Sequence, residues 1–353
     1  MTLGPNIEDT GLPSEAPDRE SVFHDLVEGH RADLHAHCYR MLGSLHDADD
    51  ALQDTLLRAW RSLPRFRGES SMRTWLHRIA TNVCLDAIAK RPKRVLPIDY
   101  GPPTAGEDHG RSPLPGSRWI EPFPDEVVGV TDGKTAPDAR LERREALELA
   151  FAAALQHLPP RQRATLILRD VLGFSAKETA ESLGVTVPAA NGALRRARAT
   201  VAERVPEQTQ QATLRELGDR KLREIVERFA DSFERGDIDA ILAMLTDDAS
   251  FAMPPFREWC RGRDEIAKSW LMPEGPAPRL RYVAARANGQ LALGAYAIRP
   301  DGTYEPIALD VLTLRGDLIA DMTVFRDTSS FPRFELPERL SDAPTGPRRG
   351  DTG

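Results

Sequence analysis

Proline spacing separates the parts of this chain that can be helical from a part that cannot. Nine prolines fall between residues 91 and 140. Each proline lacks a backbone N–H donor and fixes its own φ, so a stretch this rich in proline cannot build a packed helical domain. We therefore predict a semi-extended linker over residues 92–137. Its Trp119–Pro124 segment is aromatic, which favours docking on a neighbouring domain, with a solvated linker as the alternative.

Before the linker, residues 21–91 have helical periodicity. Apolar side chains recur three and four positions apart, a spacing that indicates helices with one buried stripe each. We predict a first helix after Ser21, a second over Asp47–Arg61 and a third over Ser71–Lys90. Acids in the first turn of the second helix and arginines in its last turn suit the helix dipole.

After the linker, residues 138–205 predict a second helical domain. One amphipathic helix spans residues 141–158, and another over Gln162–Leu172 follows two prolines. The domain ends in a helix-turn-helix, with Ser175–Leu183 as its first helix and Thr186–Glu203 as the longer second one. The first of these begins with Ser-Ala-Lys-Glu, which has the spacing of a capping box.

Residues 219–330 have a different pattern, which predicts an α+β cone. Helices are expected over Lys221–Arg235, Ile238–Leu245 and Gly262–Leu271, and strands over Leu280–Ala287, Gln290–Ile298, Tyr304–Leu314 and Leu318–Phe325. Asn-Gly and Asp-Gly pairs between the strands are typical of hairpin turns and predict an antiparallel sheet. The polar segments 1–20 and 338–353 are expected to be disordered. The predicted fold class is therefore multidomain: two all-α domains followed by an α+β cone.

Composition excludes several classes of protein. No apolar run approaches the roughly 20 residues that a bilayer-spanning helix needs, and the N-terminus has no apolar signal segment. Cys38, Cys84 and Cys260 are odd in number and far apart, which argues against a disulfide framework. His35 and His37, beside Cys38, point to different faces of one helix, so we predict no metal site and no cofactor. These features indicate a soluble, cytosolic protein without membrane contact.

Charge is unevenly distributed along the chain, although its net value is only −7. Residues 58–94 contain ten basic and two acidic side chains, and Asp47, Asp49, Asp50 and Asp54 lie just before them. A local patch of this kind determines which polyanion or partner a surface attracts. A solvated surface is the alternative for a charge run considered alone.

The start of the predicted third helix is basic and aromatic. Cations replace the counterions condensed on nucleic acid, and aromatic or polar groups beside a positive groove can capture an unstacked base. Arg73 and Arg78, with Trp75 and His77, supply both kinds of group. Aromatic residues at helical spacing also fit a core, and we expect Trp75 to be at least half buried.

The second helix of the helix-turn-helix carries Asn191, Arg195, Arg196 and Arg198. Asparagine can pair with adenine and arginine with guanine in the major groove, while neighbouring arginines bind phosphate. Many helix-turn-helix pairs never touch DNA. Two DNA-facing modules joined by a linker are more specific than either module alone.

Three segments together resemble the bacterial sigma-70 family of RNA polymerase sigma factors, of the extracytoplasmic-function type. They are DADDALQD from residue 47, FRGESSMRTWLHRIATNVCLDAIAKR from residue 66 and LPPRQRATLILRDVLGFSAKETAESLGV from residue 158. The resemblance covers about residues 20–205. It implies binding to core RNA polymerase and to promoter DNA, and an anti-sigma factor as a further candidate partner.

The resemblance also implies roles for individual residues. The second helix would dock on the coiled coil of the large polymerase subunit through Asp47, Asp49, Asp50, Gln53 and Asp54. The minus-ten element would be opened and read by Phe66, Arg67, Arg73, Trp75, His77, Arg78 and Asn82. The minus-thirty-five element would be read by Thr186, Pro188, Ala189, Asn191, Arg195, Arg196 and Arg198. The family more often has Ser, Lys or Arg where this chain has Pro-Ala-Ala-Asn-Gly from residue 188, which makes Asn191 and Arg195 the leading candidates for base contacts.

The third block resembles the SnoaL-like (NTF2-like) fold. The matching residues are the Asp237–Leu245 helix, DDASFAMPP from residue 247, and Trp259 with the Arg-Gly-Arg from residue 261. Such cones often hold a pocket, for which Trp259, Tyr296 and Asp310 are the candidate lining residues and a small molecule the candidate ligand. We predict a non-catalytic domain that modulates the sigma factor, with Trp119 and Phe123 of the linker as its latch.

Two other interpretations are open. In the first, the cone is an enzyme that isomerises or cyclises a small metabolite, and the helical half couples it to transcription. It would need a pocket acid or base and donors for an oxyanion. In the second, the chain is a helix-turn-helix repressor that acts without polymerase, for which the acidic Asp47–Asp54 segment would have no use.

Overall fold

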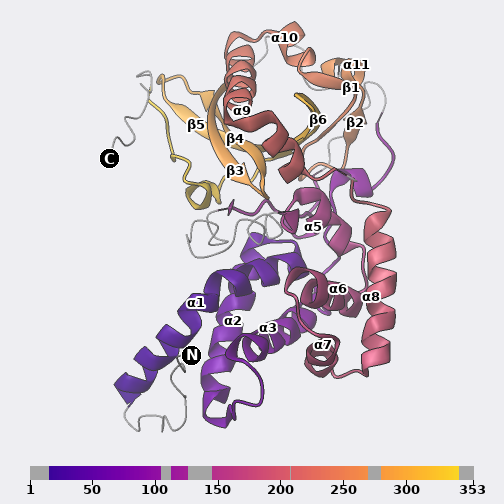
Figure 1. Cartoon of the computed structure of the whole chain (residues 1–353). Helices are drawn as coiled ribbons and strands as arrows, with labels where there is room; N and C mark the ends of the chain where they lie inside the picture. Colours follow the sequence, from indigo (N-terminus) through magenta and orange to yellow (C-terminus); the bar gives the residue numbers. More distant parts are fainter. Residues whose placement is uncertain (1–15, 105–112, 126–144, 207, 269–279, 342–353) are drawn as a thin grey trace, which may run out of the picture.

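The computed structural model describes residues 16–104, 113–125, 145–206, 208–268 and 280–341. They form a helical half and a cone-shaped α+β half, which meet around helix α5, Leu149–Gln156 (Figure 1). Two interfaces determine which surfaces of the molecule are exposed. One lies between the two helical domains, and the other lies between these domains and the cone.

The first helical domain contains α1 (Ala16–Leu42), α2 (Leu45–Ser62) and α3 (Met72–Ile88). Serine caps start two of these helices, since Ser44 Oγ accepts the backbone N–H of Asp47 and Ser71 Oγ accepts that of Thr74. A 3-10 turn at Leu63–Arg65 ends α2 at a proline, as predicted. The prediction of a disordered start was wrong for residues 16–20, which belong to α1, while residues 1–15 lie outside the described part.

The second helical domain contains α5, α6 and the predicted helix-turn-helix. Its further elements are α6 (Pro160–Leu166), the π-helical turn η5 (Ile167–Val171), α7 (Ala176–Leu183) and α8 (Val187–Ala202). Ser175 and Glu178 form the predicted capping box, and Gly184 ends α7 with a φ of 62°. The helix predicted over 141–158 begins only at Leu149, and its residues 141–144 lie outside the described part.

The two helical domains share one hydrophobic core, which their sequence pattern does not predict. Leu34 and Leu76 of the first domain belong to the same buried cluster as Ile167 and Ala197 of the second. Phe123 of the linker is completely buried in this cluster. The two domains are therefore packed against each other and are not separate units on a tether.

The cone consists of a curved sheet covered on its concave side by α9 (Gln210–Arg235) and α10 (Ile238–Leu242). The remaining elements are α11 (Arg263–Ile266), β1 (Leu245–Ala252), β2 (Trp259–Arg261), β3 (Leu280–Ala287), β4 (Gln290–Ile298), β5 (Tyr304–Arg315) and β6 (Leu318–Phe325). The strand order is β2-β1-β6-β5-β4-β3. Because β1 runs parallel to β6, the sheet is mixed. The antiparallel pairing predicted for the four strands β3, β4, β5 and β6 is confirmed.

The convex face of the sheet packs on the helical half. Leu96 and Ile120 of the linker, and Leu149 and Ala153 of α5, lie in one buried cluster with side chains of β4 and β5. The short helix η7 (Phe331–Phe334) covers part of the same face. Residues 338–341 were predicted to be disordered, but Leu340 forms an antiparallel bridge with Tyr304 at the start of β5, while residues 342–353 lie outside the described part.

The described parts of the linker, residues 92–104 and 113–125, lie between the two halves and include the 3-10 turns η2 (Pro97–Asp99) and η3 (Gly116–Arg118). Trp119 is 3% exposed and Phe123 is fully buried, which confirms that the aromatic segment docks. The rest of the predicted linker, residues 105–112 and 126–137, lies outside the described part.

Candidate functional site

The acidic end of α2 is partly neutralised within the chain. Asp47 is 9% exposed and pairs with Arg91 and Arg94, the latter at 2.8 Å. Asp49 lies 2.9 Å from His35 Nε2 and 2.6 Å from an Nη of Arg333. In this arrangement both carboxylates are already paired within the chain, and their contact with polymerase stays a prediction. The sequence pattern does not reveal these ion-pair partners, because they lie far from the two acids in the sequence.

Three of the five predicted polymerase contacts face solvent. Asp50, Gln53 and Asp54 are all exposed. They follow the i, i+3, i+4 spacing that places side chains on one helix face, so they form a single polar strip. Asp50 and Asp54 give this strip a negative charge, so it can attract a basic protein surface. The opposite face of the helix is packed against the rest of the domain.

The predicted minus-ten segment is covered by the second helical domain. Arg73 Nη2 donates a hydrogen bond to the Leu172 carbonyl at 2.8 Å, and the guanidinium lies 4.9 Å from the ring centre of Phe174. Thr74 Oγ1 donates to Glu178 of α7 at 3.1 Å. The face that would meet an unwound strand is therefore a contact between domains.

The aromatic residues of the predicted minus-ten segment are largely buried, whereas side chains that read an unwound DNA strand have to be exposed. Trp75 is 6% exposed and stacks at 4.9 Å on the half-buried ring of Phe66. His77 is fully buried against Phe174, and burial lowers its pKa to about 4. The prediction that His77 contributes to an exposed binding surface was wrong, because α3 packs on α1 and α2 with one face and on α7 with another.

Three predicted minus-ten residues remain on the surface. Arg67 lies in the loop before α3, and Arg78 and Asn82 are one turn apart on α3 itself. All three side chains are exposed. They are the exposed members of the predicted minus-ten set.

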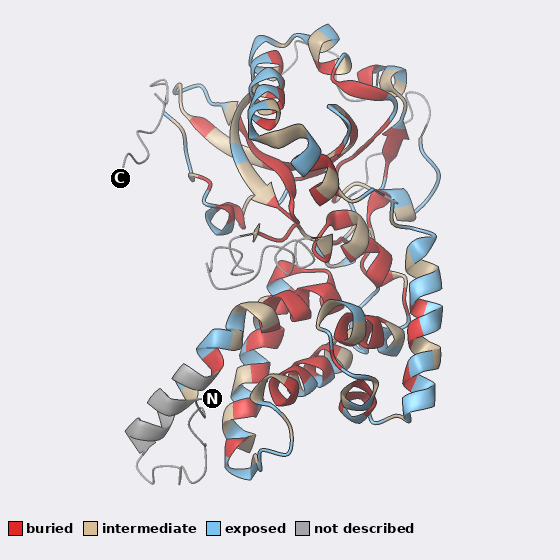
Figure 2. Ribbon diagram, viewed as in Figure 1, coloured by how far each residue is buried: buried red, intermediate tan, exposed pale blue. Residues whose placement is uncertain are grey.

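Helix α8 runs along the side of the helical half with its outer face in solvent (Figures 1 and 2). The exposed predicted residues are Thr186, Pro188, Ala189, Asn191, Arg195 and Arg196. Thr186 caps the helix, since its Oγ1 accepts the backbone N–H of Ala189 at 3.3 Å. Arg198 is different: it donates two hydrogen bonds to Asp170, at 2.7 and 2.8 Å, and so attaches α8 to η5.

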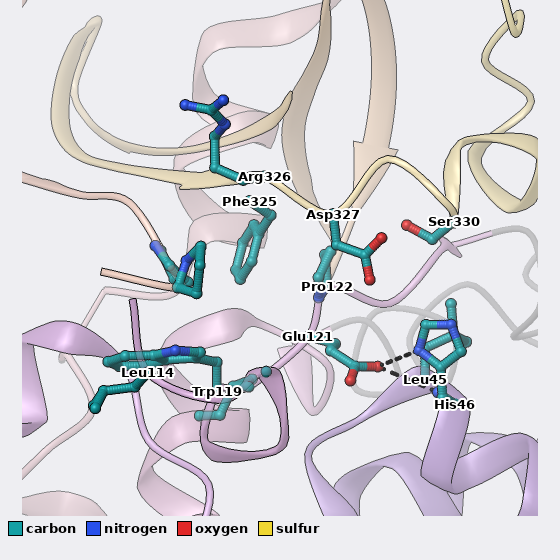
Figure 3. Close-up of a pocket in the computed structure, with 14 residues that line it drawn as sticks. Leu45, His46, Leu114, Trp119, Glu121, Pro122, Phe325, Arg326, Asp327 and Ser330 are labelled. Carbon is teal, nitrogen blue, oxygen red and sulfur yellow. Dashed lines mark hydrogen bonds and ion pairs between the residues drawn. The ribbon is translucent and has the colours of Figure 1, made fainter. Parts of the chain in front are cut away.

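The linker is attached to the start of α2 by a set of polar contacts. Arg94 Nη1 donates to the Trp119 carbonyl at 2.6 Å and to Glu121 at 3.2 Å. Glu121 also accepts from Ser44 Oγ at 2.9 Å and lies 2.9 Å from His46, whose pKa it raises by hydrogen bonding. Figure 3 shows this pair at the edge of a cavity of about 330 Å³ between α2, the linker and the cone.

The β3–β4 turn of the cone inserts into the helical half. Asn288 is fully buried with a φ of 55°, and its Nδ2 donates to Tyr39 Oη and to the Leu147 carbonyl, both at 2.8 Å. Its Oδ1 accepts the backbone N–H of Phe123 at 2.9 Å. One side chain thus joins α1, the linker and the segment before α5. The sequence pattern predicts a turn here but gives no sign of this contact.

Only one of the three predicted pocket residues lines the cavity of the cone. Asp310 of β5 lies in it, beside Tyr282 of β3. Tyr296 points to the convex face, where its hydroxyl donates to the Pro337 carbonyl at 2.7 Å, and Trp259 Nε1 donates to the Gly101 carbonyl at 2.8 Å. The strand alternation explains the difference, because Tyr282 and Asp310 share the face of β4 residues Leu293 and Ala295 and Tyr296 does not.

Family models match each of the three parts of the chain. They are Sigma-70 region 2 over residues 26–94, Sigma-70 region 4 over 148–201 and the SnoaL-like domain over 226–322. Together with the acidic strip, the basic α3 and the exposed helix-turn-helix, they define a promoter-recognition protein of the sigma-70 class.

Relatives identify the family within this class. The chain is 39% identical over 328 residues to the ECF RNA polymerase sigma factor SigG of Mycobacterium tuberculosis, covering 92% of this chain and 86% of SigG. It is 27% identical to SigJ of the same species, covering 90% of this chain and 96% of SigJ. The chain belongs to the extracytoplasmic-function (ECF) family of RNA polymerase sigma factors, which bind core RNA polymerase and promoter DNA and direct initiation.

A solved structure has the same fold over most of the chain. The crystal structure of SigJ of Mycobacterium tuberculosis superposes with a TM-score of 0.55 at 22% identity, covering 90% of this chain and all of SigJ. The helices of the described ranges lack the combination of length and apolar character that crossing a membrane requires.

Proposed function

We propose that this sigma factor contacts core polymerase through Asp50, Gln53 and Asp54, the minus-ten strand through the start of α3, and the minus-thirty-five element through the exposed face of α8. We further propose that the arrangement described above is a resting state in which these surfaces cannot act together. The protein would act in the cytoplasm, where its polymerase works. An anti-sigma factor stays a prediction.

The proposal of a resting state rests on the contact between α3 and α7. The two promoter elements lie about 25 base pairs apart by their numbering, or roughly 85 Å at 3.4 Å per base pair. In this structure α3 touches α7 directly, through Arg73 and Thr74. Helix α8 follows α7 after one short turn, and its 16 residues span only about 24 Å. The two domains must therefore separate before one chain can reach both elements.

The cone is suited to hold the resting state without catalysing a reaction. Arg333 pairs with Asp49 on the polymerase-binding helix, and Asn288 joins the cone to both helical domains. Among the described residues that line the cone cavity, Asp310 is the one carboxylate and no histidine occurs. The relatives that match over most of the chain are sigma factors, which supports a regulatory domain over an enzyme.

Separation of the two helical domains can be measured by fluorescence energy transfer. We expect dyes on Asp86→Cys of α3 and Lys177→Cys of α7, both exposed positions, to show high transfer in the purified protein. Transfer should fall to near zero in a complex with core polymerase and promoter DNA, because the labelled helices would then lie on different promoter elements. A pair placed within the second domain, Lys177→Cys with Glu203→Cys, is the control and should not change. High transfer in the active complex would disprove the resting-state proposal.

The two DNA-facing surfaces should respond differently to substitution. We expect Arg78→Ala to reduce open-complex formation by about 5- to 50-fold. Arg195→Ala should reduce the dependence of initiation on the minus-thirty-five element by a similar factor. Arg78 is a cleaner probe than Arg73, which also holds α3 against the second domain. Run-off transcription on promoters with and without the upstream element measures both effects. Arg220→Ala, on the exposed side of α9, is the control, and an equal loss for all three variants would contradict the assignment.

A further inference from the structure

A cavity of about 400 Å³ lies where the first helical domain, the linker and the second helical domain meet. Its walls include Ile88 at the end of α3, Lys93 of the linker and Pro160 at the start of α6. The volume falls in the range of known small-molecule sites, which is roughly 300–1,000 Å³. The roles assigned above do not use this cavity, and a molecule bound in it would touch both helical domains.

The charge of this cavity is mainly positive. The described lining contains four cationic side chains, which are Arg91, Lys93, Arg94 and Arg163. Asp47 is the one carboxylate among the described lining residues, and it pairs with both Arg91 and Arg94. Arg94 also pairs with Glu121 of the linker at 3.2 Å. Two acids therefore balance Arg91 and Arg94, and they leave the other two cations.

The ammonium group of Lys93 has a neutral partner. Its Nζ donates to Nδ1 of His157 at 2.9 Å, while Nε2 of the same ring lies 2.9 Å from Asp99. Burial lowers the pKa of His157, so the ring is neutral at neutral pH and can accept at Nδ1. Asp99 also lies 3.6 Å from Arg204, which offsets its charge. The Lys93 side chain is exposed, so a ligand in the cavity can reach its ammonium group.

The guanidinium of Arg163 is a buried charge. Arg163 is 4% exposed, and its hydrogen bonds in the described part of the chain go to neutral oxygens, such as Gln156 Oε1 at 2.6 Å and the Leu158 carbonyl at 3.3 Å. Burial lowers its pKa to about 10, so the group stays charged at neutral pH. A buried charge is costly unless an opposite charge lies near it. An anion in the cavity would supply that opposite charge.

We propose that this cavity binds a small molecule that carries a phosphoryl group. Lys93 and Arg163 are two positive charges without an acid to balance them, and a phosphate monoester carries about −1.5 to −2 at neutral pH. Lys93 and the exposed side chain of Arg91 would contact the phosphoryl oxygens, while Arg163 acts through its charge from within the wall. The remainder of the ligand would pack on Pro92 and Pro159.

Calorimetric titration of the full-length protein with three probes of matched shape tests the site at neutral pH and constant ionic strength. The probes are phenyl phosphate, phenyl sulfate, which carries a single negative charge, and phenyl methanesulfonate, which is uncharged. We expect phenyl phosphate to bind and phenyl sulfate to bind about tenfold more weakly, because it has less charge to balance the two cations. The uncharged ester should not bind measurably. No binding of phenyl phosphate, or equal binding of the uncharged ester, would overturn the proposal.

Variants distinguish the cavity from the basic segment around it. Lys93→Gln should weaken the binding of phenyl phosphate by about tenfold, because it removes a charge that meets the phosphoryl group. Lys90→Gln is the matched control: Lys90 is also exposed and lies three residues earlier, but it is outside the described lining, and its variant should bind like the parent. Equal loss in both variants would show a general attraction of the basic segment and would contradict the site. Circular dichroism would show that each variant is folded.

The DNA backbone is a second source of phosphoryl groups, and competition separates it from a small molecule. An excess of a single-stranded oligonucleotide should leave the affinity for phenyl phosphate unchanged, because the proposed DNA contacts Arg78 and Arg195 lie outside the cavity lining. Displacement of phenyl phosphate by the oligonucleotide would assign the cavity to the DNA backbone and overturn the proposal. Phenyl phosphate should also raise the melting temperature of the parent, because it binds the folded chain, and raise that of Lys93→Gln by less.

Discussion

Replacing Asn288 with glycine is expected to release the cone from the helical half. The change removes three buried side-chain hydrogen bonds, to Tyr39, Leu147 and Phe123, and leaves polar atoms of both domains unsatisfied. Glycine accepts the φ of 55° at this position without strain, and the backbone bond from residue 288 to the Phe123 carbonyl can persist. The Tyr39 hydroxyl keeps its hydrogen bond to the Glu121 carbonyl, so two groups lose their partner. Unsatisfied buried groups cost about 1–3 kcal/mol each, so docking should weaken by roughly 2–6 kcal/mol, or about 30-fold or more.

Two measurements would detect this release. Calorimetry should resolve separate unfolding transitions for the cone and the helical half where the parent chain unfolds in one. Binding to core polymerase should tighten, because Arg333 no longer competes for Asp49 once the cone has left. Asp301→Gly is the matched control in the other predicted hairpin turn: Asp301 is exposed, and its hydrogen bonds go to Thr303 of the same turn. If Asn288→Gly behaved like this control, the turn would not be what holds the cone.

The sequence pattern correctly predicted those parts of the fold that depend on interactions within a short segment. The bounds predicted for β3, β4 and β6 match the structure, because alternating side chains and a tight turn both lie within a short segment. Strand β1 was missed: its polar Thr-Asp-Asp and the following prolines hide the alternation. Its parallel partner β6 lies about 70 residues away, as in the pairing of Phe251 with Met322, and no local signal reports such a contact.

The exposure of the candidate residues follows from one helix in some cases and from the packing of two domains in others. Asn191 and Arg195 of α8 lie on an exposed face, and their contact with DNA stays a prediction. Spacing could not show that Asp49 meets Arg333, because ion pairs between distant segments follow from domain packing. His77 was missed for the same reason, since it packs on His37 of α1 and on Phe174 of the second domain. In this protein the contact between the two helical domains covers part of the surface that was predicted to act on DNA.

The exposed strip on α2 allows polymerase to approach before the cone leaves. Asp50 and Asp54 stay in solvent in the closed arrangement, whereas Asp49 is held by Arg333. An exposed ion pair such as this one contributes at most about 1 kcal/mol, so a basic polymerase surface that is already docked on the strip could displace Arg333. Polymerase would then be the agent that opens the chain, and the strip would determine whether opening begins.

Reversing the two charges of the strip should therefore strongly weaken holoenzyme formation in the full-length chain. Asp50→Arg with Asp54→Arg replaces attraction by repulsion across the interface, and we expect core binding to weaken by at least 30-fold at low salt and by less at high salt. Glu227→Arg with Asp231→Arg is the matched control, because these acids have the same i, i+4 spacing on an exposed face of α9. Fluorescence anisotropy of the labelled protein with core polymerase measures both pairs. Equal loss in the two variants would show a general effect of charge, and no loss in the first would place the polymerase contact elsewhere.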